Sequence, residues 1–122
     1  MIKTPCEIIV WNFLPALRRE LVKAMIKNGF KRNEIAKIFD MTESAISQYV
    51  KSKRGTNFEF DEKMKKQIEK SAIKIANSKS RETFITETHR FCSLLKKQGV
   101  FCRLHKKENP FLSGCDLYKN LD

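Results

Sequence analysis

Apolar residues in this chain recur at the spacing of α-helices, and this periodicity limits the possible folds more than any other feature. Glycine and proline, which interrupt helices, number only four and three in 122 residues. The alternation typical of β-strands is nearly absent. We therefore expect an all-α fold, with helices over residues 4–11, 14–27, 33–39, 42–51, 61–77 and 81–98.

Residues that favour helix ends stand at these boundaries. Thr4 begins a capping box that Glu7 closes, and Thr42 and Ser80 are expected N-caps of later helices. Pro15 is expected to bend or restart the first helical stretch. The stop signals are Asn28-Gly29 and Gly99, and residues 100–122 are predicted to be irregular.

The chain is strongly basic along its whole length. Lys and Arg number 25 and Asp and Glu 14, which gives a formal net charge of +11. Residues 1–58 carry 11 basic and 5 acidic groups, and residues 59–122 carry 14 and 9. A polyanion partner and a lysine-rich surface kept for solubility explain this charge equally well.

Neither a membrane span nor a secretion signal is expected. The longest uncharged apolar stretch, 8–17, contains Asn12 and Pro15 and falls short of the ~20 residues that a span needs. The N-terminal residues lack the apolar core of a signal peptide, so we expect a cytoplasmic protein.

The helices expected at 33–39 and 42–51 form a helix-turn-helix candidate, because a tight turn at Asp40-Met41 joins them. Ala36 is small enough for a close crossing, and Ile35, Ile46 and Val50 would hold the pair together. In a helix-turn-helix, the second helix lies in the major groove of DNA. Such short helices also occur in bundles that do not bind DNA.

The second helix carries suitable side chains on its expected outer face. Gln48 can pair with adenine, and Ser44 and Ser47 can contact bases or phosphates. Thr42 offers a hydroxyl and a helix N-terminus to a phosphate. The expected DNA-contacting residues are Thr42, Glu43, Ser44, Ser47, Gln48, Lys51, Lys53 and Arg54.

The run from Asn33 to Gly55 resembles the xenobiotic-response-element type of helix-turn-helix. With the opening at 5–18, it is similar to a family of small archaeal predicted transcription regulators. The specific parts are Thr42 to Tyr49 and Lys53-Arg54-Gly55. The chain departs from that family at Lys31, where a Ser or Thr cap is usual, and at Asp40, where Gly is usual. Asp tolerates the left-handed conformation, so the turn is expected to survive.

Four cysteines suggest a metal centre, since a cytosolic setting disfavours disulfides. Cys92, Cys102 and Cys115 lie within 24 residues, and Cys6 stands in the first turn of an expected helix. Cys92 and Cys102 are also plausible as small core residues. Cys115 fits that role poorly, because it lies in a polar Ser-Gly-Cys-Asp segment.

Two metal centres compete. Zinc would take Cys92, Cys102, Cys115 and His105 as a closed set of four ligands. An iron–sulfur cluster, 4Fe-4S or 3Fe-4S, would take the three cysteines, with Cys6 as a possible fourth ligand. The archaeal family often has Cys-x2-Cys pairs here, and Leu95 and Tyr118 stand in place of the second cysteines. This incomplete set favours the iron–sulfur cluster.

We therefore expect a homodimeric regulator of transcription that binds double-stranded DNA. Residues 1–58 would be the DNA-binding domain, and residues 59–122 would dimerise and sense redox, iron or sulfur state through the cluster. The alternatives are a zinc-stabilised DNA binder without sensing, an iron–sulfur enzyme acting on nucleic acid, and an RNA binder. We expect no enzyme, because neither His89 nor His105 stands in a catalytic pattern.

Overall fold

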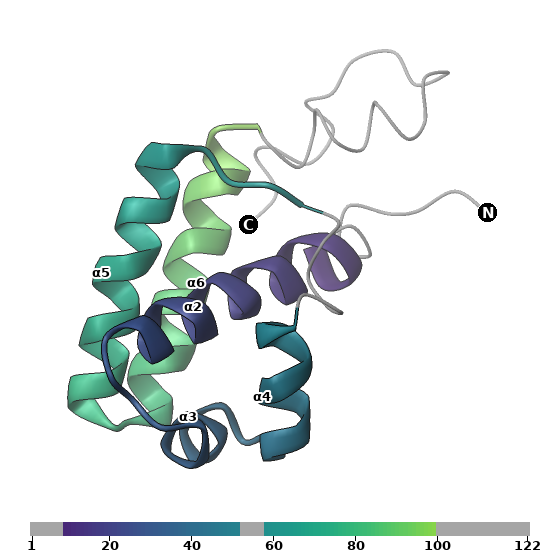
Figure 1. Cartoon of the computed structure of the whole chain (residues 1–122). Helices are drawn as coiled ribbons and strands as arrows, with labels where there is room; N and C mark the ends of the chain where they lie inside the picture. Colours follow the sequence, from purple (N-terminus) through teal and green to yellow (C-terminus); the bar gives the residue numbers. More distant parts are fainter. Residues whose placement is uncertain (1–8, 52–57, 100–122) are drawn as a thin grey trace.

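The computed structural model describes residues 9–51 and 58–99, and these residues fold entirely into helices and connecting turns (Figure 1). The elements are η1, a π-helical turn over Ile9–Phe13, and five α-helices: α2 Leu14–Lys27, α3 Arg32–Phe39, α4 Glu43–Val50, α5 Glu62–Ser78 and α6 Arg81–Lys97. The predicted all-α class is confirmed.

The α-helices begin and end within two residues of the predicted positions, because the expected caps operate. The Ser80 hydroxyl accepts hydrogen bonds from the Glu82 and Thr83 amides. In addition, Asp61, which is not among the expected caps, accepts a hydrogen bond from the Met64 amide at 2.7 Å through its carboxylate. Gly29 and Gly99 follow the ends of α2 and α6 with φ of +91° and +72°, a region that glycine enters without strain.

The first turns of the described chain differ from the prediction. η1 runs directly into α2, and Pro15 is the second residue of α2 rather than a bend between two helices. Proline has no amide hydrogen to donate there, and its fixed φ is compatible with a helix. Residues 4–8 of the predicted first helix lie outside the described residues.

Helix α2 is the centre of the packing. It packs against α5, α4 and α3, and Figure 1 shows it crossing between α5 on one side and α4 on the other. Leu17, Leu21 and Met25 are fully buried, as the helical spacing predicts. Leu14 and Ala24, expected on the same face, are only partly buried, whereas Ala16 and Val22 are buried.

Three phenylalanines anchor the segment that leads into α5. The Phe13 ring makes edge contacts with Phe58 and Phe60, with centroids 5.7 and 6.0 Å apart. The predicted boundary between residues 58 and 59 therefore falls inside a shared aromatic cluster. The assignment of separate functions to 1–58 and 59–122 stays a prediction.

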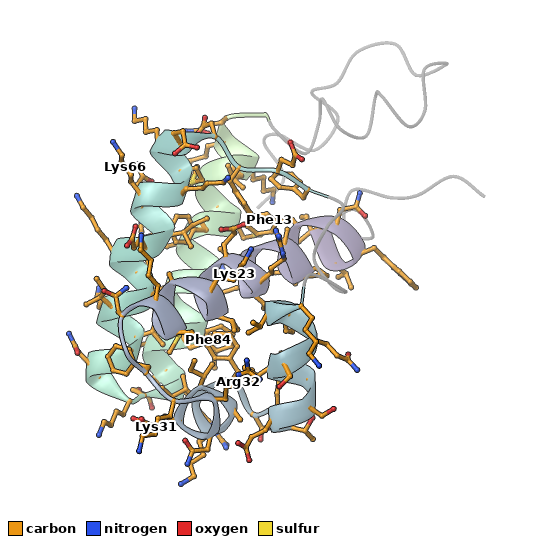
Figure 2. The ribbon with its side chains drawn as sticks, in the orientation of Figure 1. Phe13, Lys23, Lys31, Arg32, Lys66 and Phe84 are labelled. Carbon is orange, nitrogen blue, oxygen red and sulfur yellow. The ribbon has the colours of Figure 1, made fainter. Side chains whose placement is uncertain are left out.

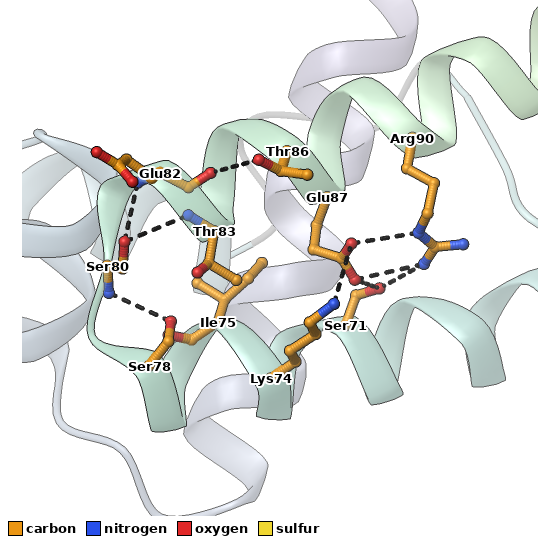
Figure 3. Close-up of polar contacts among 10 residues, drawn as sticks. All are labelled: Ser71, Lys74, Ile75, Ser78, Ser80, Glu82, Thr83, Thr86, Glu87 and Arg90. Carbon is orange, nitrogen blue, oxygen red and sulfur yellow. Dashed lines mark hydrogen bonds and ion pairs between the residues drawn. The ribbon is translucent and has the colours of Figure 1, made fainter.

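Helices α5 and α6 lie side by side and share a buried polar network (Figure 3). The Glu87 carboxylate accepts hydrogen bonds from Ser71 Oγ at 2.9 Å and from Arg90 Nε at 3.2 Å. Lys74 Nζ lies 3.9 Å from the same carboxylate. The network fixes the register of the two helices, because Glu87 is 4% exposed and a slip would leave a buried charge without partners.

None of the helices in the described ranges combines the length and apolarity that a membrane crossing requires.

Candidate nucleic-acid interface

Helices α3 and α4 are joined by a two-residue turn and a capping threonine. Asp40 adopts the left-handed conformation (φ 54°, ψ 50°) at the end of α3, and the Met41 amide donates to the Ala36 carbonyl at 2.9 Å. The turn therefore forms without the glycine that the family pattern has at this position. Thr42 then starts α4 in an extended conformation.

The two helix starts are capped in different ways. Thr42 Oγ1 accepts a hydrogen bond from the Ala45 amide at 3.1 Å, as predicted. This contact uses the oxygen as an acceptor and leaves the hydroxyl hydrogen available to a phosphate. Lys31 has no side-chain acceptor, and instead the Glu34 carboxylate accepts from the Lys31 amide at 3.3 Å.

The apolar faces of α3 and α4 are buried in the shared core. Ile35, Ile46 and Tyr49 are at most 3% exposed, and Ala36 is 6% exposed. Val50 is partly buried against the same core. Because α4 has only eight residues, this anchoring and the Thr42 cap hold it in place.

The opposite face of α4 is open to solvent. Thr42, Glu43, Ser44 and Lys51 are exposed, and Ser47 and Gln48 are half-buried. The predicted outward face thus exists on the molecule, although Ser47 and Gln48 are less exposed than the other four. Lys53 and Arg54, which complete the predicted contact set, lie outside the described residues.

Arg32 also lies at this face, although the sequence pattern did not predict it there. Its Nη1 donates a hydrogen bond to Ser47 Oγ at 2.9 Å across 15 residues of sequence, and Figure 2 shows Arg32 beside α4. Arg32 is exposed. A guanidinium has five donors, so the remaining ones are available to a guanine edge or a phosphate. The only sequence signal for this role of Arg32 is that a basic residue begins the first helix of the pair.

The start of α6 contacts and stabilises the turn between α3 and α4. Arg81 Nε donates to the Lys37 carbonyl at 3.1 Å, and Arg81 Nη2 lies 3.3 Å from the Asp40 carboxylate. The Phe39 and Phe84 rings stack with centroids 4.2 Å apart and planes 14° apart. Any displacement of the first turn of α6 therefore acts on the turn that sets the direction of α4.

Burial alone raises the pKa of Glu87 on α6, but hydrogen bonds from Arg90 and Ser71 and the charges of Arg90 and Lys74 outweigh it. The pKa of Glu87 consequently lies below its ordinary value. Glu87 is therefore a charged structural link between α5 and α6 at neutral pH.

Of the predicted metal ligands, only Cys92 lies in the described part of the chain. It is half-buried on α6 and packs against the core. Cys6, Cys102, Cys115 and His105 lie outside the described residues, and the predicted ligand set stays a prediction. Within 9–51 and 58–99, no cluster of three or more His, Cys, Asp or Glu side chains is placed to hold a metal ion.

Comparisons of the chain with family models, with curated proteins and with solved structures give no match.

Proposed function

We propose that the chain is a sequence-specific regulator of transcription that binds duplex DNA with α4. The observation that carries the proposal is the two-sided character of α4: one face is fixed in the core, and the other presents polar side chains to solvent. Together with α3 and the two-residue turn, this face supports a helix-turn-helix interpretation, and in a helix-turn-helix the second helix enters the major groove.

The side chains of this face suit the reading of base edges. Gln48 can pair with adenine through two hydrogen bonds, and Ser44 can contact a base or a phosphate. The Arg32–Ser47 contact holds a guanidinium at the edge of the same face. The Thr42 hydroxyl and the N-terminus of α4 suit a backbone phosphate.

A homodimer is part of the proposal. One eight-residue helix reaches few base pairs, whereas a two-fold pair reads two half-sites about 34 Å apart. Residues 59–122 would supply the dimer contact, and a predicted iron–sulfur cluster held by Cys92, Cys102 and Cys115 would supply the signal. Helix α6 supports a link between the two, because it carries Cys92 and also contacts the α3–α4 turn through Arg81 and Phe84.

The test starts by selecting a preferred site from a pool of random duplexes with the full chain. Binding to that site is then measured for the wild type, Gln48→Ala and Ser44→Ala by fluorescence anisotropy. Gln48→Ala is expected to weaken specific binding by about 1–3 kcal/mol and to relax selectivity at one base pair.

Gln67→Ala is the matched control, because Gln67 lies on α5 and not on the α3–α4 pair. It should bind like the wild type. A selection that yields no preferred sequence, or a Gln48→Ala variant that binds unchanged, would overturn the proposal. Preferential binding of single-stranded RNA would replace it with the RNA-binding alternative.

A further inference from the structure

Four lysines form one line along the outer side of α5. Lys63, Lys66, Lys70 and Lys74 follow one another at intervals of three, four and four residues, which places them on one helical ridge. All four are exposed. The line runs over 12 residues, which is 11 steps or about 16 Å at the rise of an α-helix.

Acidic groups do little to neutralise this lysine line. Lys74 has a carboxylate near it, that of Glu87 at 3.9 Å. Glu69 pairs with Lys27 of α2 at 3.6 Å. Among the described residues, no carboxylate lies within ion-pair distance of Lys63, Lys66 or Lys70.

The lysine line places like charges next to one another on its helix. Lys66–Lys70 and Lys70–Lys74 are like-charge pairs four residues apart, which disfavour a helix, and Glu62, four residues before Lys66, offsets this only at the start of α5. In a two-fold dimer formed through this face, the same positive surface would meet itself. The face therefore suits a polyanion and does not suit a second copy of the chain.

The lysine line lies on the other side of the molecule from α4. Figure 1 shows α5 and α4 at opposite sides with α2 between them, and Figure 2 shows Lys66 extending outward from α5. A rigid duplex held against α4 is therefore remote from the lysine line.

We propose that the lysine line of α5 is a second nucleic-acid contact, which binds the phosphate backbone of a duplex without reading its sequence. Phosphates along one strand rise by about 3.4 Å each along the duplex axis while the strand turns about that axis, so a straight line of about 16 Å meets only a few of them. Each lysine that meets a phosphate releases counterions, and this supplies the affinity. The surface acts independently of α4, and its failure leaves the proposed function standing.

A membrane surface fits this face less well. Membrane-bound amphipathic helices bury an apolar face in the lipid, whereas the apolar face of α5 is already buried against α2 and α6. A regular line of charges on a straight helix also matches a regular backbone better than an acidic loop of a protein.

The test measures binding of the full chain to a duplex that lacks any selected site, at several salt concentrations. Lys66→Gln/Lys70→Gln is compared with Lys79→Gln/Lys97→Gln, whose lysines are also exposed. Lys79 follows the last residue of α5, and Lys97 is the last residue of α6. Both variants lose two charges. Glutamine has nearly the helix propensity of lysine, so both should keep the fold, which circular dichroism checks.

We expect the slope of log K against log salt to fall by about two in the Lys66/Lys70 variant and to stay near the wild-type value in the control. Acetylation footprinting of the wild type should show protection by the duplex at Lys63, Lys66 and Lys70 but not at Lys79 or Lys97. Equal slope changes in both variants, or no protection at α5, would overturn the proposal. So would protection by polyglutamate but not by the duplex, which would indicate an acidic protein partner.

Discussion

At the scale of single residues, Arg32 changes what α4 presents to a ligand. Sequence spacing predicted serine, glutamine and threonine side chains on that helix. The structure adds a guanidinium from the preceding helix, 2.9 Å from Ser47 Oγ. This contact joins residues 15 positions apart, and so no local pattern contains it.

Arg32→Ala is expected to weaken binding to the selected site by about 1–3 kcal/mol, which is the range for loss of one good base contact. Thermal stability should change little, because Arg32 is exposed and its bond to Ser47 lies at the surface. Anisotropy titrations and thermal melts check the two effects.

Arg32→Lys separates the two ways in which Arg32 could act on DNA. Lysine keeps the positive charge but lacks the planar fork of donors. Recovery of binding by lysine would indicate a phosphate contact, and no recovery would indicate a bidentate base contact. An Arg32→Ala variant that binds like the wild type would exclude both.

At the scale of elements, α6 makes two sets of contacts that its amphipathic pattern alone did not predict. Its first turn holds the α3–α4 turn through Arg81 and Phe84, and its middle is fixed to α5 through Glu87. The pattern predicted the length of α6 and its capping by Ser80. The partners of these side chains depend on where α3 and α5 lie in space.

The Glu87 network predicts how stability depends on pH. Because the pKa of Glu87 is lowered in the folded protein, its contribution is fully present above the ordinary pKa of 4.5. The contribution is lost as the pH falls from there through the folded pKa. Thermal melts between pH 7 and pH 3.5 should therefore show a smaller acid-induced drop for Glu87→Gln than for the wild type.

At pH 7, Glu87→Gln should cost about 1 kcal/mol, since solvent screens the half-exposed Arg90 side chain. Glu82→Gln serves as the control, because Glu82 is exposed on the same helix. Equal pH profiles for the wild type and Glu87→Gln would show that the network does not contribute to acid sensitivity.

At the scale of the whole molecule, the proposed sensing role depends on a metal centre at the cysteines. Anaerobic purification followed by iron, sulfide and zinc assays separates the two predicted centres. An iron–sulfur cluster would give coloured protein with iron and sulfide, and Cys92→Ser, Cys102→Ser or Cys115→Ser should each reduce both. Colourless protein that carries zinc, and loses it in His105→Ala, would establish the zinc alternative.

The same preparations test assembly. Light scattering on the metal-loaded full chain should give the mass of a dimer, about twice 14.3 kDa. A monomer at the concentrations used for DNA binding would contradict the proposed pair of half-sites. The chain would then have to read its site with a single α4.

The sequence by itself determined the α-helices, the caps at Thr42 and Ser80 and most of the buried positions, because these depend on spacing and on neighbours within a few residues. Thr42 and Ser80 each cap as predicted for this reason. Only the tertiary structure decided that Arg32 joins Ser47, that α6 braces the α3–α4 turn, and that the lysines of α5 lie away from α4. These depend on how helices distant in sequence cross, and helical periodicity within one segment carries no information about that.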